Sequence, residues 1–373
     1  MQAALRLARR GIGSVEPNPA VGCIIVKEGR IIGKGWHKKF GGPHAEINAL
    51  RNCKELGVDP RGATMYVALE PCCHYGKTPP CTEAIITAGI VKVVAATIDP
   101  SPHANGKGIQ KLRNAGIQVQ TGVCEAEARL LNAPFIKFAA TGKCWVILKW
   151  AQSIDGKVAY AGSATHQRWI SDELSRKDAH KLRRRVQGIL VGVNTVIADD
   201  PLLTARPARG KKPIRIVLDT HLRIPLDCRL LSTARKVPVL IVTGEEAVKA
   251  GSEKADKITQ QGAELLPVPA REGQCDIEFL LEELAKRGVS QLLVEGGPIV
   301  LASFLKRQLA DEICVYIAPK ILGGLGSAAI TGPMAELGTP VSFYQVNIKR
   351  FGDDIRLTGL TEGVLRQIST DQS

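Results

Sequence analysis

The sequence predicts two successive α/β domains, and three observations support this prediction. The chain has 373 residues, which is too long for one ordinary core and fits two domains of about 150 to 200 residues. Apolar strand patterns alternate with helical patterns in both halves, which is typical of layered α/β domains. A Thr-Gly turn within residues 138–143 separates the two series. We therefore expect one domain at residues 1–141 and a second at residues 144–365.

The first domain is expected to begin with a short helix, because an apolar face in residues 4–8 ends at Gly11. Residues 17–26 then lead from a rigid proline turn into a strand, and Gly29 marks the hairpin to a strand at residues 31–32. Strands and helices continue to alternate after that hairpin, which predicts a layered arrangement. The remaining strands and the last helix of this series are expected at residues 64–69, 91–96 and 106–116.

Two further helices of this domain would each begin beside residues that can bind a metal. The first covers residues 43–57 and places His44 and Glu46 in its first turn, where the positive end of the helix favours a carboxylate. The second covers residues 78–89 and places Cys81 in its first turn, where the helix dipole lowers the pKa of a thiol. Both helix starts therefore favour the ionised side chains that a metal site needs.

His44, Cys72 and Cys81 form a candidate zinc site. Three protein ligands leave the fourth tetrahedral position for water, which is the arrangement of a catalytic site. Water is a poor nucleophile at neutral pH, and a bound metal lowers its pKa toward about 7. Glu46 would not bind the metal and would move the proton. The pattern therefore predicts the hydrolytic removal of an amino group from a heteroaromatic ring.

Each of these residues also has a simpler interpretation. Cys72 and Cys81 could form a disulfide, although ten scattered cysteines without a signal peptide suit a reducing compartment better. Cys73 should point away from the metal and act as a small buried hydrophobe. His74 could be a substitute ligand or could form hydrogen bonds within its loop. A fourth ligand from Cys73 or His74 would make the site a closed one, in a metal-stabilised scaffold without turnover.

The second domain is expected to open with an apolar strand at residues 145–150, followed by an Asp-Gly turn. A charged helix would then run from Trp169 through Arg185. Gly296 and Gly297 follow a predicted strand, so their backbone could approach a phosphate or could form a tight structural turn. No Gly-x-Gly-x-x-Gly fingerprint occurs in this half, which disfavours a Rossmann domain. The other strands and the last helix are expected at residues 188–192, 214–219, 292–294 and 300–305.

These motifs together resemble the bifunctional deaminase/reductase family of riboflavin biosynthesis. His44-Ala45-Glu46, Pro71-Cys72 and Pro80-Cys81 carry the resemblance, and residues 74–80 are similar to the insertion that separates the two cysteines in that family. The resemblance extends from Ala8 to Gly359, nearly the whole chain. It implies a cytidine-deaminase-like three-layer α/β domain followed by a dihydrofolate-reductase-like α/β domain.

The resemblance also implies two reactions in series. Zinc-dependent deamination of 2,5-diamino-6-ribosylamino-4(3H)-pyrimidinone 5′-phosphate would be followed by NADPH-dependent reduction of the ribosyl side chain, giving 5-amino-6-ribitylamino-uracil 5′-phosphate. Glu46 would be the proton donor of the first step. Asn18 would contact the substrate, and the chemistry of Lys77 and Thr78 suits contacts to its phosphate. The zinc ligands implied are His44, Cys72 and Cys81.

The same resemblance places cofactor and substrate contacts in the second domain. Arg183 and Arg206 can make bidentate phosphate contacts that lysine could not copy, although Arg183 also fits ordinary surface charge within a run of three arginines. Glu295 and Asp199 are the only acid/base candidates for reduction. The implied NADP contacts are Ser153, Trp169, Thr195, Asp199 and Gly297. The implied substrate contacts are Gln167, Arg183, Leu203, Arg206 and Glu295.

The composition limits the partners of the protein. Its formal net charge of +14 suits either nucleic acid or phosphorylated small molecules, but few aromatic residues lie among the basic clusters, which disfavours nucleic acid. No apolar run reaches about 18 residues without a charge, so no membrane span is expected. We expect a cytoplasmic homo-oligomer. The competing hypothesis is a nucleic-acid editing deaminase with a C-terminal binding domain, which would share the zinc motif but would not bind NADPH.

Overall fold

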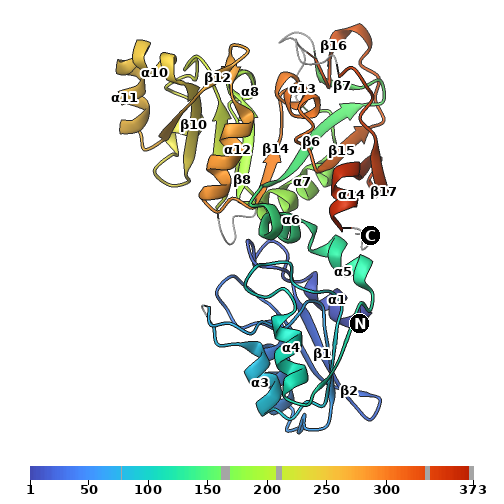
Figure 1. The fold of residues 1–373 in the computed structure, drawn as a ribbon. Helices are drawn as coiled ribbons and strands as arrows, with labels where there is room; N and C mark the ends of the chain where they lie inside the picture. The colour runs from blue at the N-terminus through green and yellow to red at the C-terminus, as the bar shows by residue number, and fades with distance from the viewer. Residues whose placement is uncertain (77, 161–168, 207–211, 332–336, 369–373) are drawn as a thin grey trace. The chain divides into compact units, whose positions relative to one another are not determined.

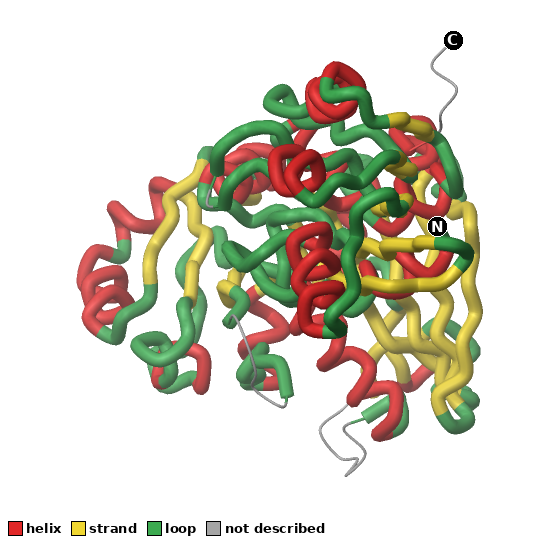
Figure 2. The backbone as a smooth tube through the Cα atoms, turned by 90° about the horizontal axis from the view of Figure 1, so that it is seen from below, coloured by secondary structure: helices red, strands yellow, loops and turns green. Residues whose placement is uncertain are grey.

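The computed structural model in Figure 1 describes residues 1–76, 78–160, 169–206, 212–331 and 337–368. The contacts of the chain divide it into two compact units. Of the described residues, the first contains Met1–Gly142 together with Gln367 and Ile368, and the second lies within Lys143–Arg366. Each unit is an α/β structure with its own main sheet, drawn in yellow among red helices in Figure 2. The predicted fold class is therefore confirmed.

The sheet of the first unit consists of β1 (Gly22–Lys27), β2 (Arg30–Trp36), β3 (Thr64–Val67), β4 (Lys92–Ala95) and β5 (Gln118–Thr121). The strand order is β2-β1-β3-β4-β5, in which β1 is antiparallel to both of its neighbours and β3, β4 and β5 are parallel. Glu28 and Gly29 both have positive φ, at 51° and 74°, as a two-residue hairpin turn requires. The predicted hairpin is therefore present.

Helices cover both faces of this sheet. They are α1 (Gln2–Ala8), α2 (Ala45–Glu55), α3 (Cys81–Thr87), α4 (Lys107–Asn114), α5 (Glu125–Leu131) and α6 (Ala133–Thr141). Apolar residues of α2, α3 and α4 share one buried cluster with the strands, whereas Leu5 and Ala8 of α1 and Ala128 of α5 belong to another. The unit is thus a three-layer α/β domain, as expected. The carboxyl end of β3 leads directly into the segment that carries Cys72.

The second unit has a larger and mostly parallel sheet. Its strands are β6 (Trp145–Ser153), β8 (Gly188–Gly192), β9 (Ile214–Leu218), β10 (Val239–Gly244), β11 (Glu264–Val268), β14 (Gln291–Val294), β15 (Glu312–Ala318), β17 (Phe343–Phe351) and β18 (Asp354–Thr361). Their order is β11-β10-β9-β8-β14-β6-β15-β18-β17, and only the pairings that involve β18 are antiparallel. The parallel strands therefore bring their carboxyl ends to one edge, where ligands of α/β sheets commonly bind.

Helices and two small sheets complete this unit. The helices are α7 (Glu173–Arg185), α8 (Val193–Asp199), α9 (Arg229–Ser232), α10 (Glu245–Ala250), α11 (Ser252–Gln260), α12 (Ile277–Lys286), α13 (Pro298–Lys306), the 3₁₀ turn η1 (Gly323–Leu325) and α14 (Glu362–Ile368). β12 (Ala270–Arg271) pairs with β13 (Gln274–Cys275), and β7 (Lys157–Tyr160) pairs with β16 (Gly326–Ala328). Leu280, Leu284 and Phe304 pack α12 and α13 onto one face of the main sheet.

The start of α7 differs from the prediction. We expected this helix to begin at Trp169, but it begins at Glu173, because Asp172 is its N-cap and accepts a hydrogen bond from Ser175 N at 2.7 Å. The last turn of α7 carries Arg183, one of the predicted substrate contacts. No helix in the described part of the chain is both long and apolar enough to cross a membrane.

Candidate active sites

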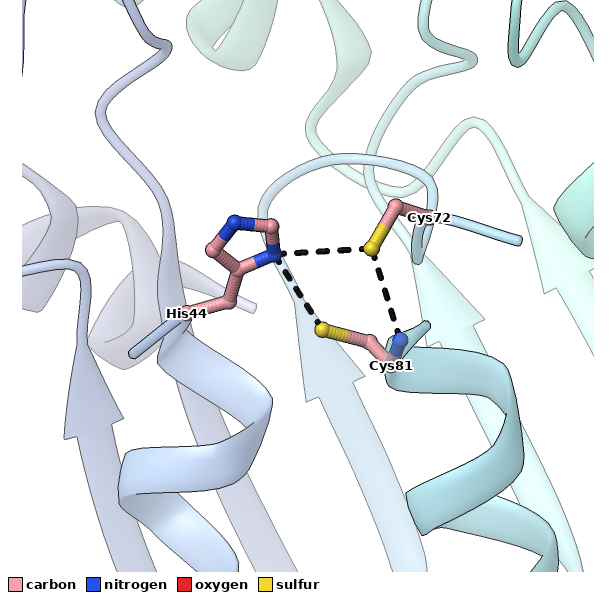
Figure 3. Close-up of side chains that lie close together, drawn as sticks. All are labelled: His44, Cys72 and Cys81. Atoms are coloured by element: carbon pink, nitrogen blue, oxygen red, sulfur yellow. Dashed lines mark hydrogen bonds between the residues drawn. The ribbon is translucent and has the colours of Figure 1, made fainter. Parts of the chain in front are cut away.

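The three predicted zinc ligands lie together, with their side chains pointing toward one another (Figure 3). Their ligand atoms are all within 4.8 Å of one another, and His44 Nδ1 lies 3.5 Å from Cys72 Sγ and 3.3 Å from Cys81 Sγ. Among the residues that the structure describes, no fourth histidine, cysteine or carboxylate joins this group. One imidazole and two thiols around a common centre are a donor set that fits a three-ligand zinc site.

The helix that carries His44 begins two residues later than predicted. We expected a start at Pro43, but α2 begins at Ala45 and His44 is its N-cap. The reason is that side chains, not a backbone N–H of the helix, bond to the carbonyl of Pro43. His37 Nδ1 and the Asn48 side-chain amide each lie 3.1 Å from this carbonyl. His44 therefore has an extended backbone, and its side chain is not restricted to helical rotamers.

The helix that carries Cys81 also begins later than predicted. α3 starts at Cys81 with Pro80 as its N-cap, whereas we expected Thr78 to be the cap. Thr78 lies instead against the predicted zinc ligand His44, with its Oγ1 3.4 Å from His44 Nε2. A partner on this second ring nitrogen fixes the ring orientation and leaves Nδ1 directed at the two sulfurs. The position of Cys81 in the first turn of α3 is as predicted.

A hydrogen bond couples the titration of the two thiols. This hydrogen bond from Cys81 is the main cause that lowers the pKa of Cys72 below its ordinary value, and His44 contributes in the same direction. The same hydrogen bond, followed by burial, raises the pKa of Cys81 well above its ordinary value. The contact between the two thiols therefore favours the thiolate form at Cys72. A bound dication would favour the thiolate form of Cys81 as well, because metal ligands must be deprotonated.

Glu46 lies in the first turn of α2 and is only 4% exposed. Burial raises its pKa to about 7, and the negative charge of Cys72 adds to this rise, while His44 and a hydrogen bond with Cys81 oppose it. A carboxyl group with a pKa near neutrality can both accept and donate a proton. The position and the pKa of Glu46 therefore suit a group that moves protons beside the metal ligands.

His37 links Asn18 to the ligand cluster, and no sequence motif distinguishes this histidine. Its Nε2 lies 3.5 Å from Asn18 Nδ2, and its ring meets that of His44 edge-on, with 5.4 Å between the ring centroids. Asn132 holds the adjoining segment, because its side chain bonds to both the N–H and the carbonyl of Ala20. The predicted contact residue Asn18 is thus placed one side chain away from a metal ligand.

Glu70 supports the loop that carries Cys72. This carboxylate is 4% exposed and accepts hydrogen bonds from the backbone amides of Asp99, Gly106 and Gly108 at 3.2, 2.9 and 2.8 Å. A side chain at Gly108 would collide with the carbonyl of Pro71, the residue before Cys72. The start of α4 is therefore packed directly against the metal-binding loop. No local sequence signal identifies this role, because the partners of Glu70 lie 29 to 38 residues away.

Replacing Gly108 with alanine should displace the Pro71 carbonyl and with it Cys72. We expect the rate of deamination to fall by about 10- to 100-fold and zinc to dissociate faster into a chelator, since loss of supporting contacts around a metal has costs of that order. Gly76→Ala is the matched control, because a side chain there would meet no atom within 4 Å. Ammonia release and zinc content measure both effects, and equal losses in the two variants would contradict the role of this packing.

In the second unit, Arg183 and Glu295 form a buried ion pair. Arg183 Nε and Nη2 donate to the two carboxylate oxygens of Glu295 at 2.8 and 2.5 Å, and Nη1 donates to the carbonyl of Thr204 at 3.1 Å. Burial alone would raise the pKa of Glu295, but the charges of Arg183 and Lys149 lower it to about 2. The side chains are 18% and 6% exposed, respectively. Arg183 is therefore not an ordinary surface charge.

Other predicted substrate residues gather around this pair. Leu203 is buried with φ at +48°, in the loop whose Thr204 carbonyl binds Arg183. His180, one turn before Arg183 on α7, lies within the electrostatic reach of Arg206 and Glu295, and burial lowers its pKa. Positive charge thus exceeds negative charge in this cluster, which suits an anionic substrate. The predicted contacts Gln167 and, in the first unit, Lys77 lie outside the described residues.

A cavity of about 270 Å³ lies at the carboxyl ends of β8 and β9 and the start of α13. Gly297 lines it, and a side chain on this glycine would lie 3.3 Å from Thr195 Oγ1. The structure therefore brings together two of the predicted NADP contacts, Thr195 and Gly297, of which Gly297 lines this cavity. The first turn of α13 adds backbone N–H groups at the same edge, which favours a phosphate.

The other predicted NADP contacts lie apart from this cavity wall. Ser153 is fully buried, and its hydroxyl donates to Asp155 at 2.5 Å and accepts from Lys157 N at 3.0 Å. The indole of Trp169 is 57% exposed. Asp199 is the last residue of α8, and Val193, the first residue of that helix, lines the cavity. None of these three residues is among the described residues that line the cavity.

Comparisons with known proteins define the class of the protein. Residues 1–97 match the cytidine and deoxycytidylate deaminase zinc-binding region, and residues 144–357 match the RibD C-terminal domain. The two units are thus those of a bifunctional enzyme that joins a zinc-dependent deaminase to a reductase. Riboflavin biosynthesis protein RibD of Aquifex aeolicus is 47% identical over 324 residues, covering 87% of each chain, and that of Escherichia coli is 37% identical over 371 residues, covering 96% of this chain and 97% of that protein.

Solved structures agree with this result. RibD of Acinetobacter baumannii has a TM-score of 0.83 at 37% identity, covering 96% of this chain and 97% of that chain. The deaminase/reductase of Thermotoga maritima also has a TM-score of 0.83, at 36% identity and 97% coverage of both chains. The chain belongs to the RibD family. It is an enzyme of riboflavin biosynthesis with Zn²⁺ and NADPH as its cofactors, and the nucleic-acid editing hypothesis is not favoured.

Proposed function

We propose that residues 1–141 deaminate 2,5-diamino-6-ribosylamino-4(3H)-pyrimidinone 5′-phosphate at the His44, Cys72 and Cys81 cluster. The observation that carries this proposal is the convergence of these three ligand atoms within 4.8 Å beside the buried Glu46. Zinc, when bound, lowers the pKa of water so that it can attack the ring carbon that bears the amino group. Glu46 accepts the proton and returns it to the departing nitrogen, and ammonia leaves.

Around this centre, the chain orients its own ligands and the substrate. Thr78 and His37 hold the His44 ring, through the contact to its Nε2 and the edge-on ring contact. Asn18, whose Nδ2 lies 3.5 Å from His37 Nε2, is the proposed contact to the pyrimidine. These contacts support a rigid site, in which the reacting groups are held before the reaction begins.

We further propose that residues 144–365 reduce the deaminated product, giving 5-amino-6-ribitylamino-uracil 5′-phosphate. Thr195 and Gly297 would hold NADPH at this cavity, and the cofactor would supply the hydride for C1′ of the ribosyl group. The C1′–O4′ bond would break as C1′ gains the hydride, and O4′ would take a proton from solvent. Arg183 and Arg206 together carry more positive charge than Glu295 can neutralise, and this excess charge binds the substrate phosphate. Gln167 and Leu203 are proposed as further substrate contacts, and Ser153, Trp169 and Asp199 as further cofactor contacts.

The protein is further proposed to be a cytoplasmic homo-oligomer that binds no nucleic acid. An edge strand supports the oligomer, because unpaired strand edges readily pair with another chain. Tyr344, Val346 and Ile348 of the edge strand β17 are 41%, 50% and 63% exposed. Light scattering of the purified protein measures the oligomeric state. A monomer at micromolar concentration would reject this part of the proposal.

Replacing Glu46 with glutamine tests the deaminase mechanism. We expect ammonia release to fall by about 10²- to 10⁴-fold, since the amide cannot move a proton and general acid–base catalysis contributes a factor of that size. Zinc content should stay at the level of the unsubstituted protein, because Glu46 is not a ligand. The NADPH-dependent reduction of supplied deaminated substrate should also stay unchanged.

Glu83→Gln is the matched control for this substitution. Glu83 lies in the first turn of α3 and pairs with Lys111 at 3.1 Å, with both side chains well exposed. Exposed ion pairs of this kind contribute little to stability, so this variant should deaminate normally. A Glu46→Gln protein that still released ammonia at the full rate would refute the role assigned to Glu46.

A further inference from the structure

The cavity beside Gly297 contains basic side chains but no acidic ones. His221 and Arg223 belong to its wall, and no aspartate or glutamate is among the described residues that line it. Both basic side chains belong to the exposed turn that follows β9. A cavity with this charge favours an anionic group over a neutral one.

The turn that carries Arg223 is fixed by a buried carboxylate. Asp219 is fully buried and accepts hydrogen bonds from Arg223 N at 2.8 Å and from Ile224 N at 2.7 Å. An acidic residue after a strand can otherwise bind the ribose hydroxyls of NAD. The carboxylate of Asp219 is already occupied by backbone amides, so it holds the turn rather than a ribose.

The guanidinium of Arg223 is also held in place, but by a neutral group. Its Nη2 donates to the side-chain carbonyl of Asn194 at 2.8 Å. No carboxylate in the described part of the chain forms an ion pair with Arg223. Because arginine has five N–H donors, most of them remain for a ligand. The cavity therefore presents a positioned and uncompensated positive charge at the carboxyl edge of the sheet.

We propose that Arg223, assisted by His221, binds the 2′-phosphate of NADPH and thereby makes the reductase select NADPH over NADH. This inference rests on the proposed placement of the cofactor in this cavity. The two cofactors differ only by this phosphate on the adenosine ribose. Gly297 and the first turn of α13 would bind the pyrophosphate on another wall of the same cavity.

Binding measurements on the full-length protein test this inference without turnover. Calorimetry gives the dissociation constants of NADP⁺, NAD⁺ and adenosine 2′,5′-bisphosphate for the protein and for Arg223→Gln. We expect the variant to bind NADP⁺ and the bisphosphate about 10- to 100-fold more weakly, which corresponds to loss of one charge-assisted contact. Its affinity for NAD⁺ should change by less than about twofold, and the ratio of kcat/KM for NADPH to that for NADH should fall to match.

Two further variants complete the design. Arg229→Gln removes another exposed arginine, outside the cavity wall, and should leave all three dissociation constants unchanged. Gln274→Trp places a bulky side chain on the cavity wall and should weaken both NADP⁺ and NAD⁺, with thermal unfolding confirming that each variant is folded.

The outcomes distinguish the placement of the cofactor in this cavity from the role of Arg223. If Gln274→Trp binds NADP⁺ normally, the cofactor lies elsewhere and both the placement and the inference fail. If Gln274→Trp weakens binding but Arg223→Gln does not, the placement stands and the inference about Arg223 fails. Equal losses of NADP⁺ and NAD⁺ in Arg223→Gln would show that Arg223 does not recognise the 2′-phosphate, and would also overturn the inference. A selective loss of NADP⁺ and the bisphosphate supports it.

Discussion

Replacement of Cys72 by serine is expected to remove the bound zinc and to abolish deamination while leaving the reductase active. Cys72 is one of the three predicted ligands, and its hydrogen bond with Cys81 lowers its pKa, which favours the thiolate that zinc binds. A serine hydroxyl stays protonated at neutral pH and cannot replace that charge. We expect the rate of deamination to fall by more than about 100-fold, because loss of a residue that only supports a metal ligand already lowers activity by up to about 100-fold.

Cys73→Ser provides a control one residue away. Cys73 is half-buried and does not belong to the cluster of ligand atoms. This variant should therefore keep its zinc and its deaminase rate. The measurements are zinc per chain by elemental analysis, ammonia release, and NADPH oxidation with supplied deaminated substrate. Stoichiometric zinc in the Cys72→Ser protein, or an equal loss in Cys73→Ser, would show that the metal is held in another way.

The ligand cluster could be predicted from the sequence because each of its parts has a local signal. A histidine and a glutamate at the start of one helix and a cysteine at the start of another can be identified within short windows. The strand that ends before Pro71 could also be predicted, from its own apolar pattern. The exact helix starts could not, because they depend on contacts from outside the window, such as those made to the Pro43 carbonyl by His37.

The supporting residues had no such signal. Glu70 acquires its role from backbone amides up to 38 residues later, and Arg183 acquires its partner Glu295 from a strand end 112 residues later. In the sequence, Arg183 is one of three consecutive arginines, and nothing local distinguishes a buried arginine from an exposed one. Only the order of the parallel strands brings α7 beside the carboxyl end of β14. Long-range pairing of this kind depends on topology, which short sequence patterns do not encode.

Replacement of Arg183 by alanine is expected to destabilise the second unit and to abolish reduction. The carboxylate of Glu295 would then be buried without its partner, which costs roughly 3–5 kcal/mol. Unfolding can be followed by tryptophan fluorescence, since Trp145, Trp150 and Trp169 lie in this unit. Arg184→Ala is the matched control, because Arg184 follows on the same helix and forms no ion pair with any residue described. Its stability should change by less than about 0.5 kcal/mol.

The loss of stability in Arg183→Ala should depend on pH in a definite direction. In the unsubstituted protein, the pKa of Glu295 is about 2, below its ordinary value of 4.5, so the stability from its ionised form is present above pH 4.5 and is lost as the pH falls toward 2. Without Arg183, burial dominates and raises the pKa of Glu295. The folded variant then binds a proton that the unfolded chain does not, and its stability deficit should shrink as the pH is lowered from 7 to 5.

A double variant separates stability from substrate binding. Arg183→Met combined with Glu295→Leu replaces the buried ion pair by apolar groups, which is often neutral or stabilising. We therefore expect this protein to unfold near the temperature of the unsubstituted one. It should nevertheless reduce its substrate at least 100-fold more slowly, because about that factor is expected when two charge-assisted contacts to the substrate are lost. A double variant that was stable and fully active would show that the pair is only structural. It would also remove Arg183 and Glu295 from the proposed substrate site.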